Sequence, residues 1–319
     1  NVFTFGVRDC SVQRRNQKII EETPPPGMDE AQIGEIEAAA ARLVEAAGYE
    51  SAGTVEFLFD IERDEFYFME VNTRLQVEHP ITEILYGVDL VKGQIDVAFG
   101  HELRFPAKQP RGVVLEARLN AEDPDRDFTP SPGFVRHFRP AAGPGVRVDS
   151  GIAQGSTIPS LFDSMVAKII VHGSDRADAI ARLRRALRET RIAIAGGTTN
   201  KAFLLYLLSQ QEVVTGPVHT KYVESLLERA ETRVRGEVPV ALVAAAIEAY
   251  IAQDADERAV FQRQISNFGY PRTAPSTGAR EVSFGYDGNG YAFTVRRVSP
   301  SAYELETDDG VIAAEYVFA

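Results

Sequence analysis

The chain has few of the residues on which disulfide-stabilised, zinc-binding and nucleic-acid-binding proteins depend. Cys10 is the only cysteine, so no disulfide can form within the chain, the usual zinc sites are excluded, and a reducing, cytoplasmic setting is expected. The sequence has no apolar run of about 18 residues and no signal-peptide pattern, which argues against a membrane protein. The formal net charge of -12 argues against a nucleic-acid partner, because phosphate contacts need a concentrated basic surface.

The remaining composition is that of an ordinary globular protein. Hydrophobic residues make up 44% of the 319 residues, enough to bury cores without disulfides or metals. The pattern predicts an α+β protein with domains at 1–107, 108–231 and 238–319 and a linker at 232–237. Because Asn1 leads directly into a strand-like run, we interpret the chain as a piece of a longer protein.

Local patterns predict the elements of the first domain. In order, these are a strand at 2–8, a Pro-Pro-Pro-Gly break at 24–27, a helix, and strands at 53–59 and 65–71 that form an antiparallel hairpin. The helix is predicted to start after the cap Asp29 and to stop at Gly48. Its apolar side is predicted to be ordinary core: Ile33, Ile36, Leu43, Val44 and Ala47.

Beyond residue 108 the pattern becomes richer in strands. The second domain is predicted to contain strands at 113–119, 134–139, 146–150 and 166–172, followed by helices at 176–189, 201–209 and 219–230. The third is predicted to contain an Ala-rich helix at 239–263, a Pro/Gly/Ser/Thr stretch at 271–278 and four strands with turns near 287–290, 299–301 and 308–310.

The predicted hairpin carries two carboxylates that would face each other. If the hairpin is centred on Arg63, Glu56 lies opposite Glu70, and Asn72 shares the face of Glu70. Like charges directly opposite each other are unfavourable unless a positive charge lies between them. Two carboxylates and an amide suit magnesium or manganese held together with nucleotide phosphates. Taken alone, the pair is more typical of a solvated strand face with exposed glutamates.

The run that follows adds polar groups in a regular order. Alternation continues through Arg74, Gln76 and Glu78, and we interpret Pro80 as the end of this strand and His79 as a structural hydrogen bonder. Such a set could hold a small planar oxyanion by a forked arginine contact while the carboxylate removes its proton. Upstream, the polar and basic stretch 8–18 is predicted to neutralise phosphate and anion charge, although such stretches are usually solvated surface.

Five motifs together resemble biotin carboxylases, which are ATP-grasp enzymes. In order they are RDCSVQRRNQK at 8–18, GTVEFLF at 53–59, EVNTRLQVEHPITE at 70–83, EARLNAEDP at 116–124 and SLFDSMVAKIIVHG at 160–173. The resemblance covers residues 1–230 and identifies 1–107 as the C-terminal half of the ATP-grasp fold and 108–231 as the biotin carboxylase C-terminal domain. It implies ATP-dependent carboxylation of biotin by bicarbonate through carboxyphosphate.

The resemblance also implies a role for each matching residue. Glu56, Glu70 and Asn72 resemble the magnesium ligands, and Lys18, Arg74, Gln76 and the Val77 backbone resemble the bicarbonate-binding groups. Glu78 resembles the base that deprotonates bicarbonate, and Arg118 the arginine that stabilises the biotin enolate. Gln13 and Asn16 resemble the ribose contacts and Leu58 the adenine contact, with Glu56 and Glu70 shared by ATP and metal. Asn16 replaces a histidine common in some members, which puts that contact in doubt.

The family's N-terminal domain, its glycine-rich lid and two ATP-binding lysines have no counterpart in the sequence. Without the lid nothing shields carboxyphosphate from water, so we expect the chain to be inactive alone and to need an N-terminal segment. No Ala-Met-Lys-Met-like biotin site occurs, because Met28, Met69 and Met165 have no adjacent lysine. Biotin is therefore expected on a carrier domain outside this chain.

The third module resembles the start of the linking domain of propionyl-CoA-type carboxylases, in which a β-barrel surrounds a helix and docks the carboxyltransferase. This favours an acyl-CoA acceptor, but acetyl-CoA, propionyl-CoA, longer acyl-CoA, pyruvate and urea all stay open. The expected partners are the biotin carrier and a carboxyltransferase, and an oligomer is expected. Two alternatives also stay open: another ATP-grasp ligase, which would not need biotin, or a structural segment of a carboxylase complex.

Overall fold

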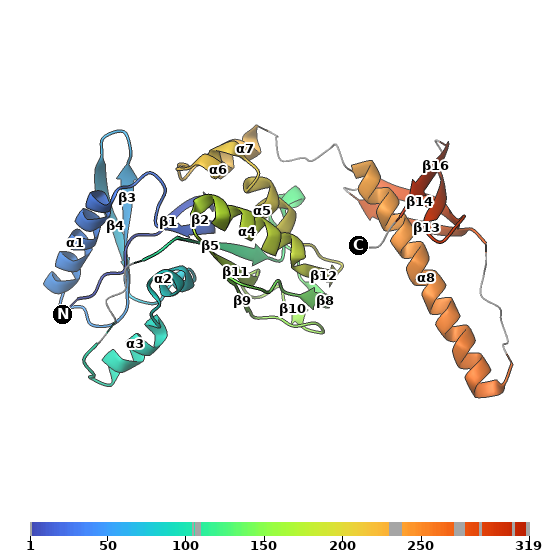
Figure 1. Ribbon diagram of the computed structural model, residues 1–319, viewed down its shortest axis with the longest axis horizontal. Coiled ribbons are helices and arrows are strands. Elements are labelled where there is room, and N and C mark those ends of the chain that lie inside the picture. Colours follow the sequence, from blue (N-terminus) through green and yellow to red (C-terminus); the bar gives the residue numbers. More distant parts are fainter. Residues whose placement is uncertain are drawn as a thin grey trace. The chain divides into compact units, whose positions relative to one another are not determined.

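The structure is a computed structural model that describes residues 2–103, 105, 110–229, 238–270, 278–286, 289–307 and 310–316. Two compact units are present, residues 1–232 and 233–319 (Figure 1). The division of the first unit at residue 107 stays a prediction. The predicted linker at 232–237, most of the stretch at 271–278 and turn residues 287–288 and 308–309 lie outside the described residues.

The first unit mixes helices with antiparallel strands. Its strands are β1 (Asp9–Arg14), β2 (Gln17–Thr23), β3 (Thr54–Asp60), β4 (Glu65–Asn72), β5 (Val113–Asn120), β6 (Glu122–Asp123), β7 (Thr129–Pro130), β8 (Gly133–Arg139), β9 (Val146–Ser150), β10 (Thr157–Ile158), β11 (Met165–Gly173) and β12 (Arg191–Ala195). Its helices are α1 (Glu30–Ala46), α2 (His79–Tyr86), α3 (Leu90–Ala98), the short η1 (Pro124–Arg126), α4 (Arg176–Glu189), α5 (Lys201–Leu207), α6 (Gln211–Thr215) and α7 (Tyr222–Glu228).

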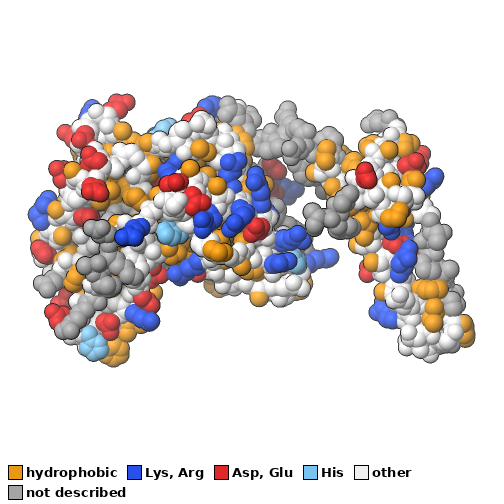
Figure 2. Space-filling view, in the orientation of Figure 1, with side chains coloured by type: hydrophobic (Ala, Val, Ile, Leu, Met, Phe, Trp, Pro, Cys, Tyr) orange, Lys and Arg blue, Asp and Glu red, His pale blue; other side chains and the backbone are white. Residues whose placement is uncertain are grey.

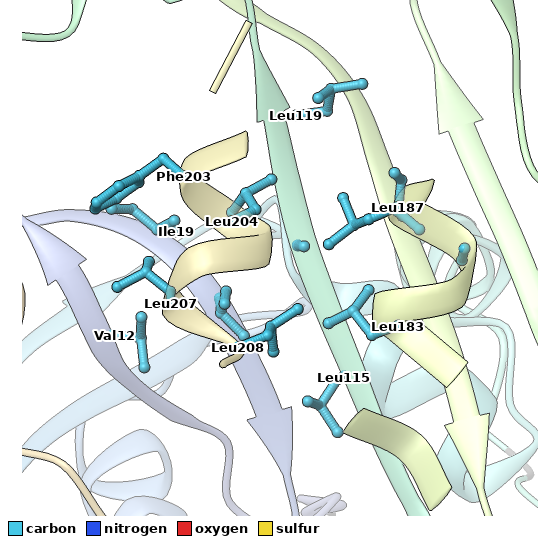
Figure 3. Packing of buried hydrophobic residues seen from close by; sticks show 14 of the residues in the cluster. Val12, Ile19, Leu115, Leu119, Leu183, Leu187, Phe203, Leu204, Leu207 and Leu208 are labelled. Atoms are coloured by element: carbon cyan, nitrogen blue, oxygen red, sulfur yellow. The ribbon is translucent and has the colours of Figure 1, made fainter. Parts of the chain in front are cut away.

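A five-stranded antiparallel sheet with the order β1-β2-β5-β11-β9 forms the centre of the unit. Side chains alternate between the two faces of a strand, so Leu115 and Leu119 of β5 face one core. Figure 3 shows α4 and α5 covering these residues, with Leu183 and Leu204 pointing at β5. The strands predicted at 113–119, 134–139, 146–150 and 166–172 are confirmed, as is the helix predicted at 176–189.

The opposite face of β5 packs against α2. Val114 of β5 and Ile170 of β11 form a small core with Ile81 and Leu85, all of them buried. Neither α2 nor α3 was predicted from the sequence, because their apolar patterns are short. This face of the sheet also carries Glu116 and Arg118, so α2 lies beside the candidate site.

The β3–β4 hairpin forms a separate two-stranded sheet, and α1 has the predicted cap. The Asp29 side chain and Gln32 form a reciprocal capping box. The predicted core stripe of α1 is wrong in extent, since only Ile36 is buried. Phe68 of the hairpin is 54% exposed. Hydrophobic side chains also reach the surface in this part of the unit, at the left of Figure 2.

The strand predicted at 2–8 is wrong, because β1 begins only at Asp9. Phe5 packs edge-on against Phe105 and Tyr86 instead. Gly6 has a φ of 66°, a left-handed conformation that does not continue a strand. This irregular segment places Arg8 beside the candidate site.

The second unit consists of one long helix and a four-stranded antiparallel sheet. The elements are α8 (Val238–Phe268), β13 (Arg280–Tyr286), β14 (Asn289–Arg297), β15 (Ala302–Thr307) and β16 (Gly310–Glu315). The strands pair in sequence order, with β13 and β16 at the edges, so the described strands form an open sheet and not the predicted barrel. Ala246, Ile247 and Tyr250 of α8 pack on Val295 and Leu305. Among the described residues, no helix has the length and apolar character needed to cross a membrane.

Candidate functional site

All the residues predicted to form the site line one cleft in the first unit. The cleft has a volume of about 1730 Å³. Its lining includes Gln13, Asn16, Lys18, Glu56, Leu58, Glu70, Asn72, Arg74, Gln76, Val77, Glu78 and Arg118. The fold therefore brings together side chains from β1, β2, the β3–β4 hairpin, the loop before α2, and β5.

Glu56 and Glu70 pair directly across the β3–β4 hairpin, as predicted. The predicted centre of the turn at Arg63 is wrong. Asp60 pairs with Glu65 at the end of the hairpin, so the turn is centred between Glu62 and Arg63. A β-bulge explains the difference: Phe57 pairs with Phe68 and Glu56 with Glu70, so Met69 is the extra residue. Because paired residues share a face, the bulge puts the phenylalanines on one face and the carboxylates on the other.

The two carboxylates and Asn72 converge on one point. Asn72 Nδ2 donates to Glu56 Oε1 at 3.1 Å and to Glu70 Oε1 at 3.0 Å. Rotation of the amide by 180° would present its oxygen in place of its nitrogen, which would complete an all-oxygen donor set of the kind that magnesium and manganese prefer. Within the described part of the chain, no three His, Cys, Asp or Glu side chains group for metal binding, so the amide and the nucleotide phosphates would complete such a site.

The segment between β4 and α2 is a loop and not the predicted continuation of the strand. Pro80 lies in the first turn of α2, where its missing N–H costs nothing, so it starts a helix and does not end a strand. His79 Nδ1 lies 2.8 Å from the Gln76 carbonyl oxygen, which confirms its structural role. Lys168 Nζ donates to the Val77 carbonyl oxygen at 2.8 Å.

Glu78 is the most enclosed of the predicted site residues, with 2% of its side chain exposed. Lys18 Nζ donates to its Oε1 at 2.7 Å, and Arg118 Nη2 donates to its Oε2 at 3.0 Å. Burial alone would raise the pKa of Glu78, but Lys18 and Arg8 lower it below its usual value. Glu78 is therefore ionised at neutral pH and able to accept a proton.

Lys18 joins Glu78 to one carboxylate of the hairpin, since its Nζ also lies 3.0 Å from Glu56 Oε1. Burial acts to lower the pKa of Lys18, but Cys10, Glu78 and Glu56 together raise it above its usual value. A bulge at Ile19, between the pairs Val12–Ile20 and Gln13–Lys18, turns Lys18 away from the core.

The remaining predicted residues lie around this centre. Gln76 Nε2 donates to Glu56 Oε1 at 2.6 Å. Arg74 is exposed, with Nη2 3.5 Å from Asn72 Oδ1. Leu58 is 48% exposed on the cleft wall, and Asn16 lies in the β1–β2 turn with a φ of 63°.

The predicted phosphate-neutralising role of the basic stretch 8–18 is wrong for two of its arginines. Arg14 and Arg15 both pair with Asp127, and neither lines the cleft. Arg14 also stacks on Phe128, with its guanidinium carbon 4.2 Å from the ring centroid. Their positive charge is therefore already balanced by a carboxylate outside the site.

The residues that form this cleft are similar in sequence to known protein families. Residues 1–105 match the family described as carbamoyl-phosphate synthase L chain, ATP binding domain, and residues 116–225 match the biotin carboxylase C-terminal domain. Biotin carboxylase 1 of Bacillus subtilis is 46% identical over 227 residues, which cover 70% of this chain and 50% of that protein. This part of the chain belongs to the biotin carboxylase family.

Two further members extend the comparison. The mitochondrial methylcrotonoyl-CoA carboxylase subunit alpha of Arabidopsis thaliana is 47% identical over 232 residues, covering 70% of this chain and 31% of that protein. The biotin carboxylase domain dimer of Hydrogenobacter thermophilus 2-oxoglutarate carboxylase, in complex with MgADP, ADP and bicarbonate, matches with a TM-score of 0.66 and 38% identity, covering 69% and 49% of the two chains. The chain spans about half the length of the Bacillus subtilis biotin carboxylase.

Several polar residues of this cleft were not predicted. Arg8 donates to Gln76, Thr54 and Thr82 and so holds the loop against the hairpin and α2. Glu21 accepts from Arg118 Nε at 2.5 Å. The sequence does not indicate this role, because a glutamate in a strand is ordinarily exposed.

Proposed function

We propose that the chain carries the metal, bicarbonate and biotin part of an enzyme that carboxylates biotin with bicarbonate and ATP. The observation that supports this best is the position of Glu78, an enclosed carboxylate between Lys18 and Arg118 in the same cleft as Glu56 and Glu70. A related carboxylase domain with the same fold binds MgADP and bicarbonate.

In the proposed reaction, Glu78 accepts the proton of bicarbonate. The bicarbonate oxygen then attacks the γ-phosphorus of ATP, the bond to the ADP oxygen breaks, and carboxyphosphate forms. Lys18, Arg74, Gln76 and the Val77 backbone would hold the bicarbonate, with charge-assisted hydrogen bonds from the two cations. In a low-dielectric cleft, fixed donors of this kind stabilise developing charge more strongly than water does.

Two further groups would complete the chemistry. Glu56, Glu70 and Asn72 would hold the magnesium or manganese ion, which neutralises charge on the transferred phosphoryl group. Gln13 and Asn16 would contact the ribose and Leu58 the adenine. Arg118 would stabilise the biotin enolate that forms when the N–H proton of biotin passes to the leaving phosphate, and the enolate nitrogen takes the carboxyl group. A guanidinium suits this role because it keeps its charge and a fixed orientation.

We also propose the partners, the oligomeric state and the cellular setting of this activity. Biotin would arrive on a separate carrier domain, and a carboxyltransferase would pass the carboxyl group to an acyl-CoA. The related carboxylase domain named above is a dimer, which supports an oligomer here. The cysteine content supports a cytoplasmic setting.

Release of ADP tests the proposal. The chain, and the longest natural protein that contains it, are incubated with magnesium and ATP while bicarbonate and free biotin are omitted in turn. Release that needs both supports biotin carboxylation. Release that needs bicarbonate but is unaffected by biotin identifies a different ATP-grasp ligase. No release from either protein favours a structural role in a carboxylase complex.

A further inference from the structure

Two carboxyl groups that the proposed reaction does not use lie buried behind the cleft. Glu21 of β2 and Glu116 of β5 are directly paired neighbours in the central sheet, and both are fully buried. Side chains paired in this way have Cβ atoms about 5 Å apart. Neither oxygen of Glu116 has a hydrogen-bond partner among the described residues, and Glu21 uses only Oε1.

The charged groups around this pair do not balance two ionised carboxylates. Arg118 Nε donates to Glu21 Oε1, while its Nη2 donates to Glu78 Oε2. Lys18 is shared between Glu78 and Glu56, and Lys168 is bound to the Val77 carbonyl and lies 3.6 Å from Asp149. Ile81 and Leu85 of α2, which pack on this face, are apolar, and the buried Thr82 of α2 accepts a hydrogen bond from Arg8. An ionised Glu116 would therefore be a buried charge without a partner, which is far more costly than a neutral acid.

We propose that Glu116 is a protonated, neutral acid at pH 7, and that its neutrality leaves Glu21 ionised to act as a positioning residue that holds Arg118 against Glu78. This inference deepens the proposed function and rests on it for the role of Arg118. With Nε held by Glu21 and Nη2 by Glu78, the Nη1 group of Arg118 has no protein partner among the described residues, so it is available to a biotin oxygen in the cleft.

The electrostatics of the pair agree with the geometry. Burial, together with the charge of Glu21, raises the pKa of Glu116 to about 9. Burial also raises the pKa of Glu21, but Arg118 limits that shift to about 7, below the value of Glu116, so Glu21 is the one of the two that ionises first. A carboxyl whose pKa is raised in the folded state binds more protons there, so stability is lost as pH rises from its unfolded value toward about 9.

Infrared difference spectroscopy tests the protonation state without any need for activity. The 319-residue chain and its Glu116→Gln variant are compared at pH 7, with Glu62→Gln, an exposed turn residue, as the matched control. The wild type and the control are expected to show the carbonyl band of a protonated carboxylic acid that Glu116→Gln lacks. The band should disappear from the wild type as pH is raised past 9. Identical spectra for the wild type and Glu116→Gln at pH 7 would overturn the proposal.

The pH dependence of unfolding supplies a second test. It can be compared between the wild type and Glu116→Gln even if the substitution changes the stability of the protein. Hydrogen exchange of the β5 amides measures opening of the first unit. Between pH 7 and 9 the opening constant of the wild type should rise relative to that of Glu116→Gln, by up to tenfold per pH unit if one proton is lost on opening. Equal pH dependence in the two proteins would mean that Glu116 carries no proton in the folded state.

The positioning role is tested at Arg118 itself. In Glu21→Gln, the Nε–H proton of Arg118 is expected to exchange with solvent at least tenfold faster by NMR, and Glu21→Asp should restore part of the protection. In the longest natural protein, Glu21→Gln should lower kcat for biotin carboxylation more than it changes the KM for ATP. Unchanged exchange would remove Glu21 as the positioning residue. Absence of biotin carboxylation in the wild type would instead contradict the proposed function and leave the infrared and exchange results standing.

Discussion

Lys18 Nζ lies 2.7 Å from Glu78 Oε1 and 3.0 Å from Glu56 Oε1. One ammonium group therefore contacts both the proposed base and a proposed metal ligand, which come from different parts of the fold. The positive charge of Lys18 offsets the repulsion between these two neighbouring carboxylates. Glu78 lies 60 residues and Glu56 38 residues from Lys18 in the sequence, and this one side chain contacts both.

Glu78→Gln should abolish the bicarbonate-dependent release of ADP while nucleotide binding stays nearly intact. The amide has the shape of the carboxylate but cannot accept the proton, and loss of a general base costs about 10²–10⁴-fold in rate. Steady-state ADP release and equilibrium binding of ATP, in the longest natural protein, check this. Glu62→Gln should behave as the wild type. Wild-type turnover by Glu78→Gln would remove Glu78 as the base.

Glu70→Gln should weaken manganese binding in the presence of nucleotide by at least about tenfold, because a neutral amide replaces one of two charged oxygen ligands. Titration followed by electron paramagnetic resonance of Mn²⁺ measures this. Glu65→Gln is the matched control, since Glu65 lies on the same strand but pairs with Asp60 at the turn. Equal manganese affinity of the two variants would place the metal elsewhere.

Acid should destabilise the first unit partly through Glu78. Its pKa is lowered from 4.5 in the folded protein, although burial acts in the opposite direction, because Lys18 and Arg8 stabilise the ionised form. The folded state then binds fewer protons than the unfolded state, so this stability is present above pH 4.5 and is lost as pH falls through the lowered pKa. Hydrogen exchange of the β5 amides should show a weaker acid dependence in Glu78→Gln than in Glu62→Gln. Equal dependence would contradict the lowered pKa.

Arg280→Ala should destabilise the second unit by about 3 kcal/mol, because removing one partner of a buried ion pair leaves the other poorly compensated. Arg280 has 6% of its side chain exposed and lies 3.0 Å from Asp254 and 2.9 Å from Glu257. Arg258→Ala is the matched control: Arg258 also pairs with Asp254, at 2.7 Å, but is 63% exposed and should cost less than about 1 kcal/mol. Hydrogen exchange of the β13 and β14 amides measures both. Similar losses in the two variants would contradict the role of burial.

The sequence was sufficient to predict elements with a strong repeating pattern and a clear stop. The helix at 176–189 and the pairing of Glu56 with Glu70 are confirmed. The pairing was predicted with a turn centred one half-residue too late, because the bulge at Met69 has no pattern of its own in the sequence. Pro80 was misinterpreted because proline ends a strand and begins a helix equally well.

What the sequence alone could not predict is which distant side chains meet. Glu78 is held by Lys18 and Arg118, which lie 60 and 40 residues away, and no local spacing encodes those contacts. Likewise, a glutamate in a strand is ordinarily exposed. Only the sheet order β2-β5-β11 shows that Glu21 and Glu116 are enclosed on the same face.

The β3–β4 hairpin is a sheet separate from the one that carries Lys18 and Arg118. The hairpin accepts hydrogen bonds from Lys18, Gln76 and Arg8. The acceptors are Glu56 and Thr54, which lie at the end of the hairpin opposite its turn. A rigid-body tilt of the hairpin would therefore move Glu56 and Glu70 away from Glu78 while the base kept its own two cations. The distance between Glu78 and the nucleotide phosphates proposed to bind at Glu56 and Glu70 therefore depends on the orientation of the hairpin. The hydrogen bonds from Lys18, Gln76 and Arg8 oppose a change in that orientation.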